Sequence, residues 1–131
     1  MKYLSLDEAI ILHNDIMEAM NGLQGYNKSQ ITYLESALTH IQNDEFYPSF
    51  LDKLTHLIFS CVKFHPLPYI VLLDGNKRTA LYIAKAFIKL NYPEFLREDF
   101  YEKLEDVVVD VASGEIDKEN LKKILIEILG L

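Results

Sequence analysis

The chain has 131 residues, half of them hydrophobic, which suffices for one domain over residues 1–131 with a buried core and no disulfide. Twenty acidic against thirteen basic residues give a net charge of −7, which opposes a general attraction to nucleic acid or anionic lipid. The single cysteine, Cys61, has no internal partner, and the sequence shows neither a signal-peptide core nor an apolar run of membrane-spanning length. We therefore expect a cytoplasmic protein whose partners include neither nucleic acid nor a membrane.

The N-terminal part of the chain is predicted to form two helices. Ser5 and Glu8 have the spacing of a capping box, so the first helix should begin there and run to about Met20. After a polar loop, Ser29 is the candidate N-cap of the second helix. Apolar residues recur at helical intervals in both segments: Ala9, Leu12 and Ile16 in the first, and Leu34, Ala37, Leu38 and Ile41 in the second.

A third helix is predicted to open at Pro48, a residue that the first turn of a helix tolerates. The apolar stripe along this predicted helix ends at a histidine, His65. By spacing alone, His65 is better explained as a core histidine at the end of an amphipathic helix than as a functional residue. The residues of the stripe follow at steps of three and four: Leu51, Leu54, Ile58, Cys61 and His65.

The C-terminal half is predicted to contain three more helices. The segment from Asn76 to Asn91 is apolar on almost all sides, so it should lie at the centre of the core, preceded by a loop. Another helix should follow Pro93 and end at Ser113-Gly114, before a last helix. Val107–Val109 is compatible with a strand, but its acidic and helical neighbours favour helix. The sequence thus predicts an all-α, compact bundle of about six helices.

The segment Asp74-Gly75-Asn76-Lys77-Arg78-Thr79 carries the candidate chemistry. As a turn at the start of a helix, it would present free backbone N–H groups and two cations to an anion, and phosphate is the natural guest. Asp74 is suited to magnesium, which prefers one or two carboxylates together with phosphate oxygens and water. The alternative is a plain turn and cap with two solvated cations.

The same segment carries a family resemblance. Phe64-His65-Pro66-Leu67 and then Asp74 to Leu81 resemble the signature of the Fic/Doc superfamily, in which a histidine-proline-aromatic segment precedes an acid, a glycine or alanine, and Asn-Lys-Arg-Thr-Ala. At two positions the chain is similar to the death-on-curing (Doc) toxin branch. The typical Fic adenylyltransferase has glycine in place of Lys77 and a second arginine in place of Leu81.

The resemblance implies a role for each residue of the segment. It implies His65 as the general base, Asp74 as the magnesium-associated acid, and Gly75-Asn76-Lys77-Arg78 as the phosphate cradle. With ATP and Mg²⁺ as cofactors, the Doc branch implies a kinase that transfers the γ-phosphate to a serine or threonine hydroxyl on a host protein, a translation elongation factor, causing growth arrest. It also implies a cognate antitoxin as a partner.

The spacing within the motif departs from the family pattern and leaves two alternatives open. The family usually places its acid four residues after the histidine, whereas Asp74 follows His65 by nine, as after a five-residue insertion. The apolar run 69–73 in this stretch should be buried or form a contact surface. Misplacing reacting groups by about 1 Å can cost about a hundredfold in rate. Either the extra residues bulge outward and leave His65 beside the phosphates, or they carry His65 away and leave a catalytically weakened binding module for an antitoxin. Independently of the spacing, the enzymatic alternative is transfer of AMP to a protein hydroxyl by the same site, against which Lys77 and Leu81 argue.

Three other histidines, His13, His40 and His56, lie in helical surroundings without the Cys/His pattern of a metal site. We interpret them as structural or exposed.

Overall fold

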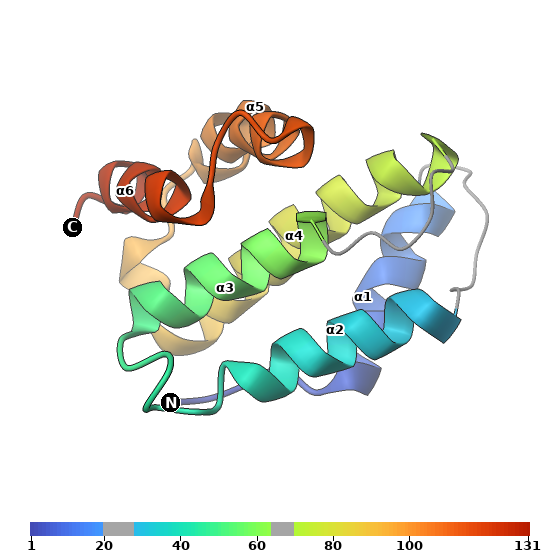
Figure 1. The fold of residues 1–131 in the computed structure, drawn as a ribbon, viewed down its shortest axis with the longest axis horizontal. Helices are drawn as coiled ribbons and strands as arrows, with labels where there is room; N and C mark the ends of the chain where they lie inside the picture. Colours follow the sequence, from blue (N-terminus) through green and yellow to red (C-terminus); the bar gives the residue numbers. More distant parts are fainter. Residues whose placement is uncertain (20–27, 64–69) are drawn as a thin grey trace.

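The computed structural model describes residues 1–19, 28–63 and 70–131, and of residues 13–14, 16–19, 28–33, 63 and 70–79 it describes the backbone only. The prediction of an all-α fold is confirmed, since the described residues form six α-helices, one short 3-10 helix and no strand. The elements are α1 (Leu6–Ala19), α2 (Lys28–His40), α3 (Phe50–Lys63), α4 (Ile70–Asn91), η1 (Pro93–Phe95), α5 (Phe100–Ser113) and α6 (Lys118–Leu129) (Figure 1).

Helices α3 and α4 form the centre of the bundle and run in opposite directions side by side (Figure 1). On one flank α1 packs against α4 and α2 packs against α3. On the other flank α5 packs against α4 while α6 packs against α3, and α5 and α6 contact each other. No helix in the described part of the chain is long and apolar enough to cross a bilayer.

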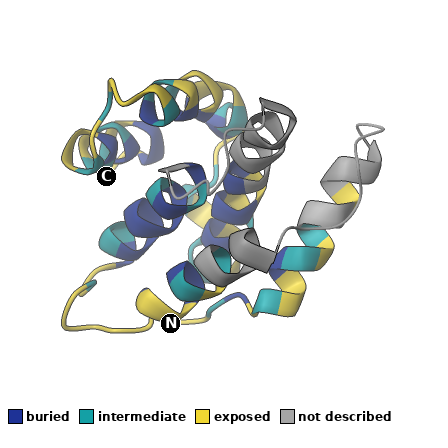
Figure 2. Cartoon of the chain, turned by 45° about the vertical axis from the view of Figure 1, so that its right-hand side comes forward, coloured by how far each residue is buried: buried dark blue, intermediate teal, exposed yellow. Residues whose placement is uncertain are grey.

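The hydrophobic core follows the predicted stripes and is deepest along α4. Ile83, Ala84, Phe87 and Ile88 have no exposed surface, whereas Lys85 on the same helix is exposed. Figure 2 shows buried residues in dark blue on the inner sides of the helices and exposed residues in yellow on the outer sides. Burial on several sides requires neighbours on several sides, which α1, α3 and α5 provide. The buried residues from α1 to α6 form one hydrophobic cluster.

Several helix ends are explained by local sequence. The Ser5–Glu8 capping box is confirmed: the Ser5 N–H donates to Glu8 Oε1 at 3.2 Å, and the Glu8 N–H donates to Ser5 Oγ at 3.1 Å. Gly114 ends α5 as predicted, with a φ of 87° that favours glycine. The prediction for Ser29 was wrong, because α2 already begins at Lys28.

The start of α3 is capped by a residue that the sequence analysis passed over. The Asp52 N–H donates to Ser49 Oγ at 3.0 Å, and that hydroxyl donates to Asp52 Oδ2 at 2.9 Å. Pro48 therefore lies just before the cap rather than inside the first turn. A serine cap of this kind stabilises a helix by roughly 1 kcal/mol.

Beneath the α2–α3 connection, the ammonium group of Lys53 is buried. The residue is 1% exposed, and its Nζ donates to the Ile41 carbonyl at 2.6 Å and to Asp44 Oδ1 at 2.7 Å. Its Nζ also lies 5.6 Å from the centroid of the Tyr3 ring. Burial by itself would lower the pKa of Lys53, but the contacts with Asp44 and Tyr3 outweigh it and raise the pKa. Lys53 thus ties the N-terminal segment and the connection to α3.

We expect Lys53→Met to lower the free energy of unfolding by about 1–3 kcal/mol, because it leaves the buried Ile41 carbonyl without its charged donor. Asp44→Asn is the matched control, and it should cost less because that side chain is 81% exposed and water can replace the carboxylate. Urea unfolding measures both. A neutral or stabilising Lys53→Met would show that an apolar side chain serves equally well there.

Candidate active site

The segment Asp74–Thr79 lies inside helix α4, in the second and third turns after its first residue, Ile70. The prediction of a loop before Asn76 and of a turn at Asp74-Gly75-Asn76 was therefore wrong. The physical reason is that Ile70–Leu73 supplies four apolar residues that continue the helix backwards. Gly75 in a helix interior costs about 1 kcal/mol relative to alanine, an amount that the packing of a central helix can offset.

This placement changes how the segment could bind an anion. The free N–H groups of an α-helix belong to its first four residues, which here are Ile70–Leu73, ahead of the motif. Any phosphate cradle at Gly75-Asn76-Lys77-Arg78 must therefore depend on side chains more than on free backbone donors. On a helix, positions 74, 77 and 78 are neighbours, because residues three and four apart lie on one face.

The other half of the predicted site, His65, lies outside the described residues together with the rest of 64–69. The structure does describe the last four residues of the long stretch between His65 and Asp74, and these residues, Ile70–Leu73, form the first turn of α4. Part of the apparent insertion therefore lengthens the helix that carries the motif.

Leu81 marks the point where the motif enters the core. It is 1% exposed, as is Ala80, and it belongs to the hydrophobic cluster that includes the buried residues of α3. This is the position at which the adenylylating pattern has a second arginine. In this protein it supplies no cation.

The free thiol Cys61 is not a candidate nucleophile. It lies on α3, and burial raises its pKa to about 12, so the thiol stays protonated near neutral pH. It has the character of a small apolar core residue.

Comparison with protein families matches residues 3–88 to the Fic/DOC family. The match covers well over half of the chain and runs from the N-terminal segment almost to the end of α4, including His65 and the whole motif. The chain therefore belongs to the Fic/DOC family, and membership implies a transferase that modifies proteins. Comparisons with curated proteins and with solved structures give no match.

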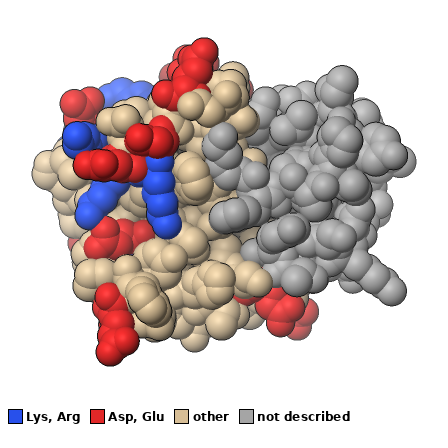
Figure 3. Space-filling view, viewed as in Figure 1, with Lys and Arg blue, Asp and Glu red and all other residues tan. Residues whose placement is uncertain are grey.

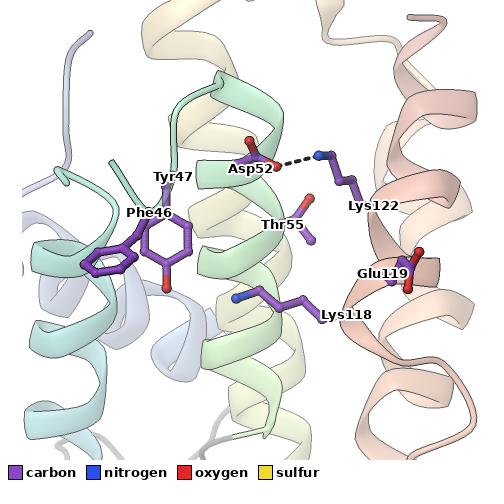
Figure 4. Close-up of a pocket in the computed structure, with 7 residues that line it drawn as sticks. All are labelled: Phe46, Tyr47, Asp52, Thr55, Lys118, Glu119 and Lys122. Atoms are coloured by element: carbon purple, nitrogen blue, oxygen red, sulfur yellow. Dashed lines mark hydrogen bonds and ion pairs between the residues drawn. The ribbon is translucent and has the colours of Figure 1, made fainter. Parts of the chain in front are cut away.

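A second group of polar residues, which the sequence analysis did not single out, surrounds a pocket of about 350 Å³ between the α2–α3 connection, α3 and α6 (Figure 4). On the view of Figure 3, acidic and basic side chains are interspersed on the side of the molecule that carries α6 and the beginning of α3. No local sequence pattern predicts this pocket, because the residues that come together there are far apart in the chain: Lys118 contacts His56, which is 62 positions away. The lining residues are Phe46, Tyr47, Asp52, Thr55, Lys118, Glu119 and Lys122.

His56 contacts two residues that line this pocket, Tyr47 and Lys118, and is buried, with 7% of its surface exposed. Lys118 Nζ lies 2.8 Å from its Nδ1, and because an ammonium group can only donate, Nδ1 is the acceptor and the proton of the neutral ring belongs on Nε2, 3.4 Å from both Tyr47 Oη and Ser60 Oγ. Burial, with repulsion from Lys118 and His40, lowers the pKa of His56 to about 4. The interpretation of His56 as structural thus agrees with its burial, while His40 is exposed.

The helical placement of the motif is tested by Gly75→Ala. In a helix interior this change should raise the free energy of unfolding by about 0.5–1 kcal/mol. Gly114→Ala is the matched control, since its φ of 87° should make alanine destabilising by about 1–2 kcal/mol. Urea unfolding of both variants distinguishes the two environments. A loss at Gly75 as large as that at Gly114 would contradict the helical placement.

The neutral state of His56 should make stability depend on pH. In the unfolded chain His56 binds a proton near its ordinary pKa of 6.5, whereas in the folded chain it does so only near 4. The stabilisation of the folded state that comes from a neutral His56 is therefore complete above pH 6.5 and is lost as the pH falls towards 4. We expect a loss of about 3 kcal/mol across this window. Urea unfolding between pH 7 and 4 should show it in the wild type and in His40→Gln, and much less in His56→Gln. Equal slopes in all three would rule out His56 as the source.

Proposed function

We propose that this Fic/DOC protein is a Doc-type kinase that transfers the γ-phosphate of ATP to a serine or threonine hydroxyl of a host protein. The observation that carries this proposal is Leu81, a fully buried apolar residue at the position where the adenylylating pattern has an arginine. Lys77, in place of glycine, favours the same branch. The cations available to the nucleotide in this segment are then Lys77 and Arg78.

The proposed roles follow the chemistry of the residues. His65 takes the proton of the attacking hydroxyl, a task suited to an imidazole that titrates near neutrality. Lys77 and Arg78 hold the phosphates, with Gly75-Asn76 allowing close approach. Phosphoryl transfer depends mainly on alignment and on compensation of phosphate charge, so a site without a covalent nucleophile is sufficient.

ATP and magnesium fit the donors that the motif offers. Asp74 provides the single carboxylate of the segment, and magnesium is commonly held by one or two carboxylates plus phosphate oxygens. When bound, the ion neutralises charge on the phosphates. Asp74, Lys77 and Arg78 occupy neighbouring positions of α4, which supports their acting on one ligand.

The partners proposed for this chain come from the Doc-like features of its sequence. We propose a translation elongation factor as the modified protein, with growth arrest as the consequence, and a cognate antitoxin as the inhibitor. Both belong to the cytoplasm, the compartment proposed for this protein.

One observation favours a second candidate function. Asp74 follows His65 by nine positions along the chain, and the four residues before Asp74 form the first turn of α4. A general base held even about 1 Å from its place can lose about a hundredfold in rate. On this alternative the chain is a weakened family member that binds an antitoxin. Transfer of AMP by the same site is the enzymatic alternative, and the burial of Leu81 speaks against it.

The decisive experiment incubates the protein with magnesium, a cell extract and ATP labelled at either the γ- or the α-phosphate. We expect transfer of the γ-label only, lost in His65→Ala and in Arg78→Ala. Lys85→Ala is the matched control, because Lys85 is an exposed cation on the same helix outside the motif. It should retain full activity.

Each other outcome selects an alternative. Transfer of the α-label would identify AMP transfer. If neither label moves while ATP still binds, the kinase proposal fails and antitoxin binding becomes the function to test. If γ-label transfer survives His65→Ala, the reaction proceeds but His65 is not its base.

A further inference from the structure

Lys118 has an unusual set of neighbours for a lysine at the edge of a pocket. Its Nζ lies 2.8 Å from His56 Nδ1 and 5.2 Å from the centroid of the Tyr47 ring. Among the residues that the structure describes, no carboxylate lies within ion-pair distance of this amine. The pocket's other lysine, Lys122, is paired with Asp52 Oδ1 at 2.5 Å. Lys118 is therefore held by a neutral ring rather than by an anion.

The surroundings of Lys118 lower its pKa, so a larger fraction of this amine is neutral than for a solvated lysine at the same pH. Burial lowers its pKa, and the carboxylate of Asp52 opposes this only partly. Lys118 is also the first residue of α6, where the positive end of the helix dipole disfavours a cation. The ring of Tyr47 favours the ammonium form weakly. The titratable groups facing it are Tyr47 from the connection, Asp52 and His56 from α3, His40 behind His56, and Glu119 and Lys122 from α6.

We propose that Lys118 is a modification site: a nucleophilic amine, positioned by His56 in the α3–α6 pocket, that accepts an acyl group from an activated acyl donor. The space next to the amine is about 350 Å³, ample for a short acyl chain, and Phe46, Tyr47 and Thr55 provide its other walls (Figure 4). The amine reaches this space from α6 while His56 holds it from α3.

The reaction balances with the donor as the only co-reactant. The lone pair of the neutral Lys118 nitrogen attacks the acyl carbonyl carbon and forms the C–N bond. The bond from that carbon to the phosphate oxygen of an acyl phosphate, or to the sulfur of a thioester, breaks and the leaving group departs with the electron pair. The surplus proton on nitrogen passes to His56 Nδ1, which lies at hydrogen-bond distance, and then to solvent. The product is an uncharged amide.

The test treats the folded protein with acetyl phosphate in one arm and acetyl-CoA in the other, and measures acetylation of each lysine by mass spectrometry over time. Lys123, an exposed neighbour on α6, is the internal control, because exposure alone would make it react faster than the half-buried Lys118. We expect Lys118 to react several-fold faster than Lys123 with at least one donor. The arm in which this occurs identifies the donor.

Two further measurements separate the proposed arrangement from simple accessibility. In His56→Asn, an amide oxygen can still accept a hydrogen bond but cannot take up a proton, so the rate at Lys118 should fall while that at Lys123 is unchanged. In urea, which unfolds the wild type, Lys118 and Lys123 should be acetylated at nearly equal rates. This comparison uses the wild type alone, so it does not depend on whether His56→Asn folds. Equal rates in the folded protein with both donors, or an unchanged preference in urea, would overturn the proposal.

Discussion

The structure depends on helix α4 remaining continuous from Ile70 to Asn91. Its C-terminal half supplies the most deeply buried side chains of the core, and its N-terminal half carries the segment Asp74–Thr79. A core helix has little freedom to shift, because protein interiors are closely packed. The motif is therefore fixed to a rigid element, and packing of α4 against α1, α3 and α5 determines where its polar residues can act.

Helix α3 adds specificity to this packing through buried polar side chains. Lys53 contacts Ile41 and Asp44 in the α2–α3 connection, and His56 contacts the connection and α6. Each buried polar group is costly unless its partners are present, so these residues disfavour other arrangements of the neighbouring helices. The apolar stripes bring the helices together, and the polar contacts select one arrangement of them.

Sequence alone predicted most of the fold, because helical periodicity and caps such as Ser5 and Gly114 are local signals. It failed before Asn76, where an Asp-Gly-Asn triplet has the composition of a turn but lies inside the continuous helix α4, because local propensity is only a weak guide to structure. The candidate site was found through its family pattern, and its residue roles stay predictions. The Lys118–His56 contact was not predictable, since it joins residues 62 positions apart and exists only after α3 and α6 have packed together.

The two candidate sites of this protein lie on different elements: the segment Asp74–Thr79 is part of α4, whereas the Lys118 pocket lies between the α2–α3 connection, α3 and α6. Helix α3 joins them, because it packs against both α4 and α6. An effect of acylating Lys118 on the motif that passes through packing contacts must therefore travel as a movement of α3 against α4. Because those two helices share the centre of the core, such a movement would disturb the packing of both, so the two sites are expected to act largely independently.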